Sequence, residues 1–208
     1  MALEIEPIKP KIRPKALIEI AWEVCNQVGG IYTVIRTKVP SMVEKWGDDY
    51  FLLGPYFPQT AAAEFEEITD LGDSKLGKTV AKMREMGFEV HYGYWLVTGK
   101  PRIVLFDFWK VFARIDEVKF ALWTRHQLST LNAEELVGHV LAFGECVRVF
   151  LTELAAAEGG KTDLVAHFHE WMAATAIPDL KVDGAKISTI FTTHATMLGR
   201  YMAPNVPD

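Results

Sequence analysis

The sequence is poor in cysteine, lacks a long apolar run and has no excess of basic residues. Only two of its 208 residues are cysteines, Cys25 and Cys146. Two are too few for a disulfide framework and predict reduced, cytosolic thiols. No apolar stretch reaches the ~20 residues of a membrane span, and the N-terminus does not resemble a signal peptide. The formal net charge is -5, which argues against nucleic-acid binding because such proteins normally carry a basic face. We therefore expect a cytoplasmic protein that binds neither membrane nor nucleic acid.

What the sequence does contain is enough apolar material for a sizeable core. Half of the residues are hydrophobic and 24% are charged, which is the balance of a globular protein. The length suits one large domain. Residues 1–15 carry three prolines and are predicted to be an extended lead, so we expect the domain itself to occupy residues 16–208.

Short strand-like runs alternate with amphipathic runs along the chain. This alternation predicts an α/β fold, a Rossmann-like three-layer sandwich with a mostly parallel sheet covered on both faces. Strands are expected at residues 16–22, 50–55, 88–97, 103–108, 164–168 and 187–192, and helices from residue 31, at 74–86, from 132 to about 158 and at 170–181. The strands at 88–97 and 103–108 are separated by a short turn and predict a hairpin.

Several local signals refine this pattern. Asn132 and Glu135 have the spacing of a capping box at the start of the long helix, and the glycine pair 159–160 should end it. Pro40 is expected to kink or restart the first helix, and Pro178 to interrupt the last one. Residues 59–71 are predicted to be an irregular connection, and residues 110–127 give no clear prediction.

Three polar clusters fall at the carboxyl ends of predicted strands. They are residues 26–30, residues 169–171 and residues 193–196, with Arg200 a little further on. In open parallel sheets, ligands bind beyond the carboxyl ends of the strands, so we expect these clusters to share one site. The Gly29-Gly30 pair stands at a strand-to-helix turn, where backbone N–H groups and a positive helix end can receive an anion. A tight turn would also explain the glycines without any ligand.

The histidine-rich segment allows more than one interpretation. His167 and His169 are two residues apart and should face the same side of a strand. Together with Glu170 and His194 they could bind zinc, although no cysteine and no HExxH spacing supports this. We favour a structural role for His167, buried and hydrogen-bonded to the backbone. Cys25 is interpreted as a small buried residue.

Two charged residues of these clusters also have alternative roles. Glu170 begins a predicted helix, where a carboxylate complements the helix dipole. It could instead accept hydrogen bonds from sugar hydroxyls. Arg200 could be an ordinary surface residue, or its planar fork of donors could hold a phosphate.

Several long motifs resemble the eukaryotic-type glycogen synthases. These blocks keep their order over nearly the whole chain, whereas residues 110–132 match poorly. The matching blocks are EVCNQVGGIYTV (23–34), YFLLGPY (50–56), GYWL (93–96), VLFD (104–107), AHFHEW (166–171) and IFTTHATMLGRY (190–201).

The resemblance implies a retaining glucosyltransferase with the GT-B fold, of which these residues would form the N-terminal half. Such an enzyme moves glucose from a nucleotide sugar, UDP-glucose or ADP-glucose, to the non-reducing end of an α-1,4-glucan such as glycogen. The resemblance implies no metal and no other cofactor, and a homo-oligomer is left open. Because the C-terminal GT-B domain is absent from these residues, we expect an incomplete enzyme that is inactive by itself.

The resemblance also assigns roles residue by residue. Gly29 and Gly30 would present backbone N–H groups to the donor phosphates, and Arg200 would help to neutralise the leaving diphosphate. His194 would contact the transferred glucose, and Glu170 would bind sugar hydroxyls near the reaction centre.

Two further positions complete the expected site. His169 is a candidate sugar contact. Gln27 is a donor-side position at which this sequence departs from the family, where Lys or Arg is usual. A neutral amide cannot supply the charge of those side chains to a diphosphate, so the part of Gln27 in donor binding is left open. Two alternative functions remain: a non-catalytic module that binds glucan or nucleotide sugar, and another GT-B transferase that forms sucrose or trehalose.

Overall fold

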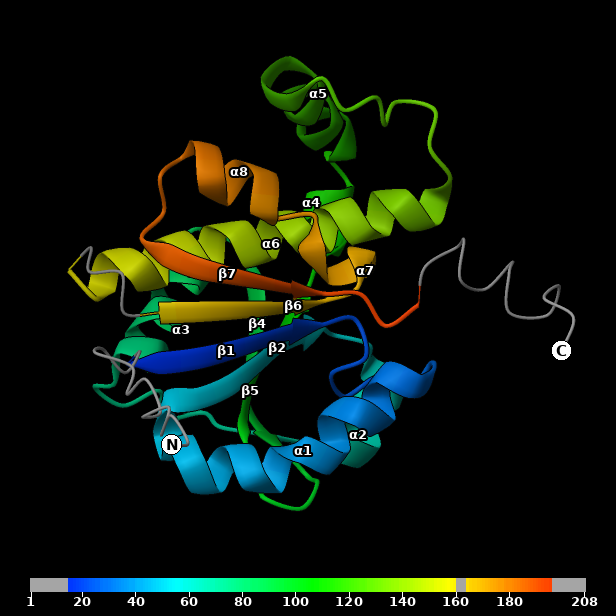
Figure 1. The fold of residues 1–208 in the computed structure, drawn as a ribbon. Coiled ribbons are helices and arrows are strands. Elements are labelled where there is room, and N and C mark those ends of the chain that lie inside the picture. Colours follow the sequence, from blue (N-terminus) through cyan, green and yellow to red (C-terminus); the bar gives the residue numbers. More distant parts are fainter. Residues whose placement is uncertain (1–14, 160–163, 196–208) are drawn as a thin grey trace, which may run out of the picture.

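A computed structural model describes residues 15–159 and 164–195. Within them, seven strands form one open sheet in the order β3-β4-β5-β2-β1-β6-β7 (Figure 1). Strands β2, β1, β6, β7 and β5 run parallel, and β3 and β4 form the antiparallel end of the sheet. The strands are β1 (Ala16–Ala21), β2 (Tyr50–Pro55), β3 (Phe65–Glu67), β4 (Glu89–Trp95), β5 (Arg102–Asp107), β6 (Leu164–His169) and β7 (Ile187–Thr192).

Helices cover both faces of the sheet, which confirms the predicted three-layer α/β sandwich (Figure 1). One face carries α1 (Gly30–Trp46) and α2 (Pro58–Glu64), with a short 3-10 turn, η1 (Gly47–Asp49), between α1 and β2. The other face carries α3 (Lys75–Glu85), α4 (Trp109–Phe112), α5 (Ile115–His126), α6 (Glu135–Ala157), α7 (Trp171–Ala174) and α8 (Ile177–Val182).

Strand β1 is central because both of its faces are buried. Ile18 and Ile20 belong to the core on the α6 side, whereas Leu17 and Ala21 belong to the core on the α1 side. This division follows from the two-residue period of a strand. The same period places Glu19 on the α1 side, where this acidic residue is 1% exposed.

Helix α6 forms the main cover of the second face, as its apolar periodicity predicted. Val140, Phe143, Val147 and Phe150 are all fully buried. The helix also needs a glycine at position 144, because a Cβ there would lie 2.0 Å from Thr175 Oγ1. This close approach brings the segment between α7 and α8 against α6, and so helps to place the end of β6.

Two local predictions were wrong, and a third was confirmed in a modified form. Residues 59–71 are not irregular, since most of α2 and the whole of β3 fall within them. The residue before α6 is Glu134, which makes no side-chain capping bond, so Asn132 does not form the predicted capping box. The predicted helix at 170–181 is interrupted near Pro178, as expected, and forms two short helices. Pro178 lies in the first turn of α8, where its missing N–H costs nothing.

The other local predictions agree better with the structure. Strands β4 and β5 pair antiparallel, as expected for a hairpin. Helix α1 is an exception, because it runs through Pro40 without the restart that was one of the two expected effects of this proline. Gly159 follows Glu158, the C-cap residue of α6, and has a φ of 76°, a conformation that suits glycine. Gly160, the second glycine of the predicted pair, lies outside the described residues.

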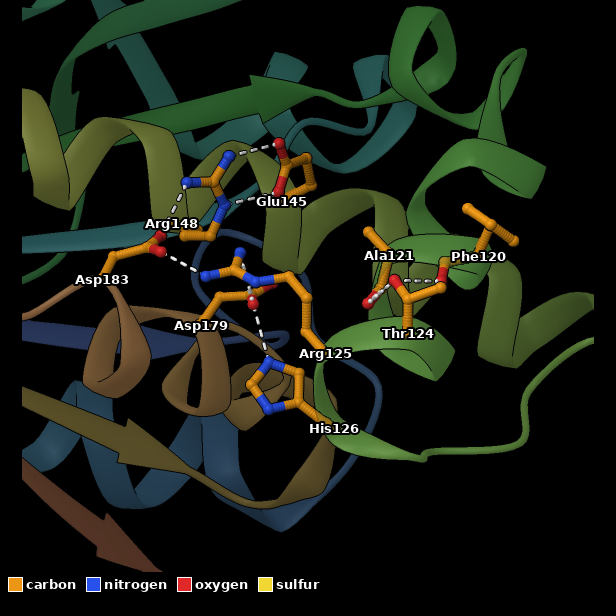
Figure 2. Close-up of polar contacts among 9 residues, drawn as sticks. All are labelled: Phe120, Ala121, Thr124, Arg125, His126, Glu145, Arg148, Asp179 and Asp183. Carbon is orange, nitrogen blue, oxygen red and sulfur yellow. Dashed lines mark hydrogen bonds and ion pairs between the residues drawn. The ribbon is translucent and has the colours of Figure 1, made fainter.

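A group of ion pairs joins α5 to α6 and α8, in the segment that gave no sequence prediction (Figure 2). Asp179 Oδ1 lies 2.7 Å from both Arg125 Nη1 and His126 Nε2. Asp183 accepts a hydrogen bond from Arg125 and lies 3.4 Å from Nη1 of Arg148. The charges on three helices are therefore paired with one another, which fixes α5 on the outer side of α6.

Among the described residues, no helix combines the length and the apolar character that a bilayer crossing requires.

Candidate functional site

The predicted clusters meet at one edge of the sheet. The β1–α1 turn, the end of β6 and the end of β7 all lie at the carboxyl ends of parallel strands, on the right-hand side of Figure 1. The register pairs Ala21 with His169 and His169 with Thr192, so the three strands end at the same level. This confirms the predicted meeting of the segments, while the roles of the individual side chains stay predictions.

The glycine pair stands at the start of α1, as predicted. Gly29 is the residue before the helix and Gly30 is its first residue. The carboxylate of Glu23 accepts hydrogen bonds from the backbone N–H of Gly29 at 2.8 Å and of Tyr32 at 2.9 Å. An internal anion therefore already complements the positive end of α1. Another anion that takes the Gly29 amide would have to replace Glu23.

The two glycines differ in what surrounds them. A Cβ on Gly29 would lie 3.2 Å from Glu23 Oε1, so the tight approach of Glu23 explains this glycine. A Cβ on Gly30 would meet no atom within 4 Å. The fold of the described residues therefore gives no packing reason for Gly30.

The rest of the turn divides into a buried and an exposed part. Cys25 and Asn26 are buried, and burial raises the pKa of the Cys25 thiol to about 12, with the charge of Glu64 adding to it. Cys25 is therefore the small buried residue that the sequence predicted, rather than a nucleophile. Asn26 donates a hydrogen bond from Nδ2 to the carbonyl of Trp22 at 3.1 Å. Gln27 is exposed and belongs to the outer part of the turn.

Glu170 occupies a backbone conformation that is unusual for any residue with a side chain. Its φ is 64° and its ψ is 170°. Almost only glycine adopts this conformation, and for a residue with a side chain it costs of order 1–3 kcal/mol. Its Oε1 atom accepts hydrogen bonds from the hydroxyl of Thr193 at 3.1 Å and from the backbone N–H groups of His194 and Ala195, the latter at 2.9 Å. Strain of this kind concentrates at functional sites.

The charge of Glu170 is favoured by this arrangement. Burial alone would raise the pKa of the carboxyl, but the hydrogen bonds from Ala195, His194 and Thr193 outweigh it, so the pKa is lowered. The carboxylate thus stays ionised and holds the backbone that leaves β7. The sequence did not predict this supporting role, since it depends on a contact across 25 residues.

The histidines form a stacked group at the same edge. The ring centroids of His167 and His169 are 4.2 Å apart, which confirms that they face the same side of β6. His169 Nδ1 lies 3.0 Å from Nε2 of the exposed His194. His167 Nε2 lies 2.8 Å from the hydroxyl oxygen of Thr192. The fully buried histidine is His169, 2% exposed, and His167 bonds to a side chain, so the predicted burial and backbone bond of His167 were wrong.

Sequence reasoning missed Glu19, which lies on β1, the strand next to β6, and pairs in register with His167. Its Oε1 atom pairs with the ammonium of Lys38, and its Oε2 atom accepts a hydrogen bond from the hydroxyl of Tyr50 at 2.9 Å. Burial would raise the pKa of this carboxyl, but attraction to His167, His169 and Lys38 outweighs it and holds the pKa well below its usual range. The signal that could have revealed Glu19 is a lone acidic residue within an otherwise apolar strand.

A metal could in principle use part of this group. Ligand atoms of Glu19, His167 and His169 lie within 4.8 Å of one another, and a carboxylate with two imidazoles is a donor set suited to zinc. However, the Lys38 ammonium already neutralises Glu19. A metal ion would have to displace Lys38, so the residues fit a metal poorly.

Arg200 falls outside the described residues. A pocket of about 920 Å³ lies at the opposite edge of the sheet, with Ala16, Asp48, Phe51, Ser74 and Arg102 in its lining. This pocket is remote from the predicted clusters.

Comparison with known proteins identifies the family. A family model described as glycogen synthase matches residues 19–208. The chain is 38% identical over 198 residues to a glycogen (starch) synthase of Neurospora crassa, covering 95% of this chain and 28% of that protein. It is 40% identical over 186 residues to the liver glycogen (starch) synthase of Homo sapiens, covering 89% of this chain and 26% of that protein. The isoform 1 enzyme of Saccharomyces cerevisiae is 37% identical over 193 residues, with 89% and 27% covered.

These matches also define what the chain represents. It spans only 26–28% of the length of these relatives. The matched region nevertheless includes the described clusters at the ends of β1, β6 and β7. This chain therefore belongs to the glycogen synthase family.

Proposed function

We propose that this chain forms the N-terminal half of the cleft of a retaining, GT-B-type glucosyltransferase. The complete enzyme would transfer glucose from UDP-glucose or ADP-glucose to the non-reducing end of an α-1,4-glucan. Family membership supports this proposal, together with the gathering of Gly30, Glu170 and His194 at one edge of the sheet. We further propose a cytoplasmic location and a reaction that needs no metal or other cofactor.

The observation that carries the proposal is the open space beside Gly30. The residue is exposed at the first turn of α1, and an added Cβ would meet no atom of the described residues within 4 Å. A glycine without a packing role at a helix N-terminus suits the close approach of a phosphate to backbone N–H groups. A nucleoside diphosphate is the leaving group that such a site would receive.

The proposed chemistry uses the other residues of this edge. Breaking the bond between glucose and the diphosphate builds positive charge on the sugar and negative charge on the leaving group. Fixed donors and cations that meet the leaving charge lower the barrier. We assign this task to the Gly30 amide and to Arg200, and the contact with the transferred glucose to His194. Glu170 holds the backbone of His194 and Ala195 in place, and its carboxylate would also accept sugar hydroxyls.

Glucose transfer in a protein that joins these residues to the remaining length of the enzyme tests the proposal. We expect His194→Ala and Arg200→Ala each to lower kcat about 100-fold or more, the usual loss when one transition-state contact is removed. Arg114→Ala is the control, because Arg114 is a half-exposed residue whose side chain pairs with Glu117 at 3.7 Å. Wild-type turnover in both site variants would refute the assignment.

A second function is a non-catalytic module that binds glucan or nucleotide sugar. The exposed residues Gly30 and His194 could contact such a ligand without transferring glucose. We expect the isolated chain to show no elongation of glycogen from either nucleotide sugar. Measurable elongation by the isolated chain would contradict this alternative.

A further inference from the structure

A row of polar side chains leads from helix α1 to the candidate site at the end of β7. It begins at Lys38 on α1, passes through Glu19 on β1 and His169 at the end of β6, and reaches His194 just after β7. Only its last member is exposed, whereas Glu19 and His169 are at most 2% exposed. The row therefore connects a buried charge with a proposed sugar contact.

The buried carboxylate of Glu19 is held in one place. Its Oε1 atom pairs with Lys38, and its Oε2 atom accepts the Tyr50 hydroxyl at 2.9 Å. Both partners donate hydrogen, and the lysine supplies a full positive charge. Glu19 therefore remains an ionised acceptor, and it presents negative charge to the histidine rings on β6.

His169 stands between this carboxylate and His194. Its Nε2 atom lies 3.9 Å from Glu19 Oε1, is buried and has no hydrogen-bond partner among the described residues. Its Nδ1 atom lies 3.0 Å from Nε2 of His194. A lone pair on Nε2 would face the carboxylate unfavourably, whereas an N–H dipole at that atom is attracted to it. The Nε2–H form of His169 is therefore favoured, which leaves Nδ1 as the acceptor.

We propose that Glu19 acts through His169 as a positioning residue that fixes His194 in its neutral Nε2–H tautomer. Because His169 Nδ1 accepts, the hydrogen bond at 3.0 Å requires His194 to donate from Nε2. Valence then leaves the Nδ1 atom of His194 with a lone pair. His194 would present an acceptor to its ligand, and this matches a hydroxyl group that donates, as every sugar hydroxyl can.

The sugar ligand in this inference rests on the proposed function, but the tautomer of His194 does not. A purely structural role of Glu19 would need only its bonds to Lys38 and Tyr50 and would leave the histidine protons unconstrained. The distinguishing measurement must therefore report the protonated nitrogen of each ring, and not activity or stability alone.

Long-range ¹H–¹⁵N spectra of the imidazole rings provide this measurement on the 208-residue chain. At about pH 8, above the ordinary pKa of histidine, the rings are neutral and each tautomer gives its own pattern. We expect the Nε2–H tautomer alone for both His169 and His194. In Glu19→Gln the fixed charge is lost, so we expect His194 to become a mixture of both tautomers.

Variants of His169 give a second and independent test if Glu19→Gln does not fold. His169→Phe removes the acceptor, so His194 should become mixed, whereas His169→Asn keeps an acceptor oxygen near the Nδ1 position and should preserve the Nε2–H form. The matched control is His167→Gln. His167 lies 3.6 Å from the same carboxylate oxygen but bonds to Thr192, so His194 should not change.

Two results would overturn the inference. One is a wild-type His194 in the Nδ1–H form. The other is a His194 pattern that stays the same in both Glu19→Gln and His169→Phe. Glucose transfer tests the proposed function separately. If the tautomers behave as expected but His194→Ala still turns over normally in the longer protein, the proposed role of His194 fails, whereas the positioning role of Glu19 stands.

Discussion

The Oε1 atom of Glu170 accepts a hydrogen bond from the backbone N–H of Ala195 at 2.9 Å. This contact ties the end of β6 to the chain that leaves β7, and the same oxygen also accepts from His194. Glu170 adopts a φ of 64° to make these bonds. Backbone strain and a fixed loop therefore occur together at the edge where we place the reaction.

The backbone strain at Glu170 predicts that a glycine variant is more stable than an alanine variant at this position. Glu170→Gly and Glu170→Ala both remove the carboxylate, but only glycine adopts this conformation without strain. We expect the glycine variant to be more stable than the alanine variant by about 1–2 kcal/mol in urea unfolding. The control is the same pair of substitutions at Lys78 within α3. There Lys78→Gly should be less stable than Lys78→Ala, because glycine is unfavourable in a helix interior. Equal stability of the two Glu170 variants would contradict the strain.

The space around the glycine pair predicts two different responses to alanine. Gly30→Ala should keep or raise the free energy of unfolding, by up to about 1 kcal/mol, because the new Cβ meets no atom and the unfolded chain loses freedom. Gly29→Ala should lower it, because its Cβ would press on Glu23 Oε1 at 3.2 Å. Chemical denaturation of both variants checks this. A destabilised Gly30→Ala variant would mean that Gly30 serves the fold.

The buried His169 predicts a dependence of stability on pH. Burial lowers the pKa of His169, an effect that Glu19 only partly offsets. The unfolded chain therefore binds this proton more readily than the folded one, so stability is fully present above about pH 6.5, the unfolded value, and falls as the pH drops toward the folded value. The slope from this group can reach about 1.4 kcal/mol per pH unit. His169→Asn should flatten the slope below about pH 6.5, and an unchanged slope would rule out His169 as its source.

The ion-pair group on α5, α6 and α8 predicts a loss of stability when its centre is removed. Asp179→Ala leaves both Arg125 and His126 without their shared carboxylate, which lies 2.7 Å from each. We expect a loss of about 2 kcal/mol, the scale of a partly buried charged hydrogen bond. Asp73→Ala is the control, because its pairing with Lys78 is solvent-exposed and should leave the melting temperature unchanged. Equal melting temperatures of both variants would contradict a structural role for this group.

The order of strands and helices was predictable because the pattern of apolar residues is local. Runs such as those of β1 and α6 carry their period in adjacent residues, and the fold follows from their alternation. The segment 59–71 was misjudged because β3 is only three residues long and is held by its pairing with β4. Asn132 showed a capping spacing, but α6 begins without a side-chain cap at Glu134. Short elements of this kind depend on distant partners that a sequence does not display.

The site was predictable at the level of segments and not at the level of contacts. The carboxyl ends of parallel strands meet at one edge, so residues 26–30 and the ends of β6 and β7 could be brought together by topology alone. The hydrogen bond from the Gly29 amide to Glu23 depends on the conformation of the turn. The hydrogen bond from Ala195 to Glu170, which holds the chain after β7, depends on a contact between distant residues. Glu19 was missed because its importance arises only when β1, α1 and β6 pack together.

The central claim is that the edge formed by α1, β6 and β7 receives the nucleotide sugar. Its most direct test is titration of the ¹⁵N-labelled chain with UDP-glucose and ADP-glucose, while the backbone N–H signals are followed. We predict that the signals of Gly30 and His194 shift on saturation with one of these donors, and that Gly30→Ala weakens this binding without unfolding the chain. Signals that shift only at the opposite edge, around Ser74 and Arg102, or that shift nowhere at saturating donor, would contradict the claim.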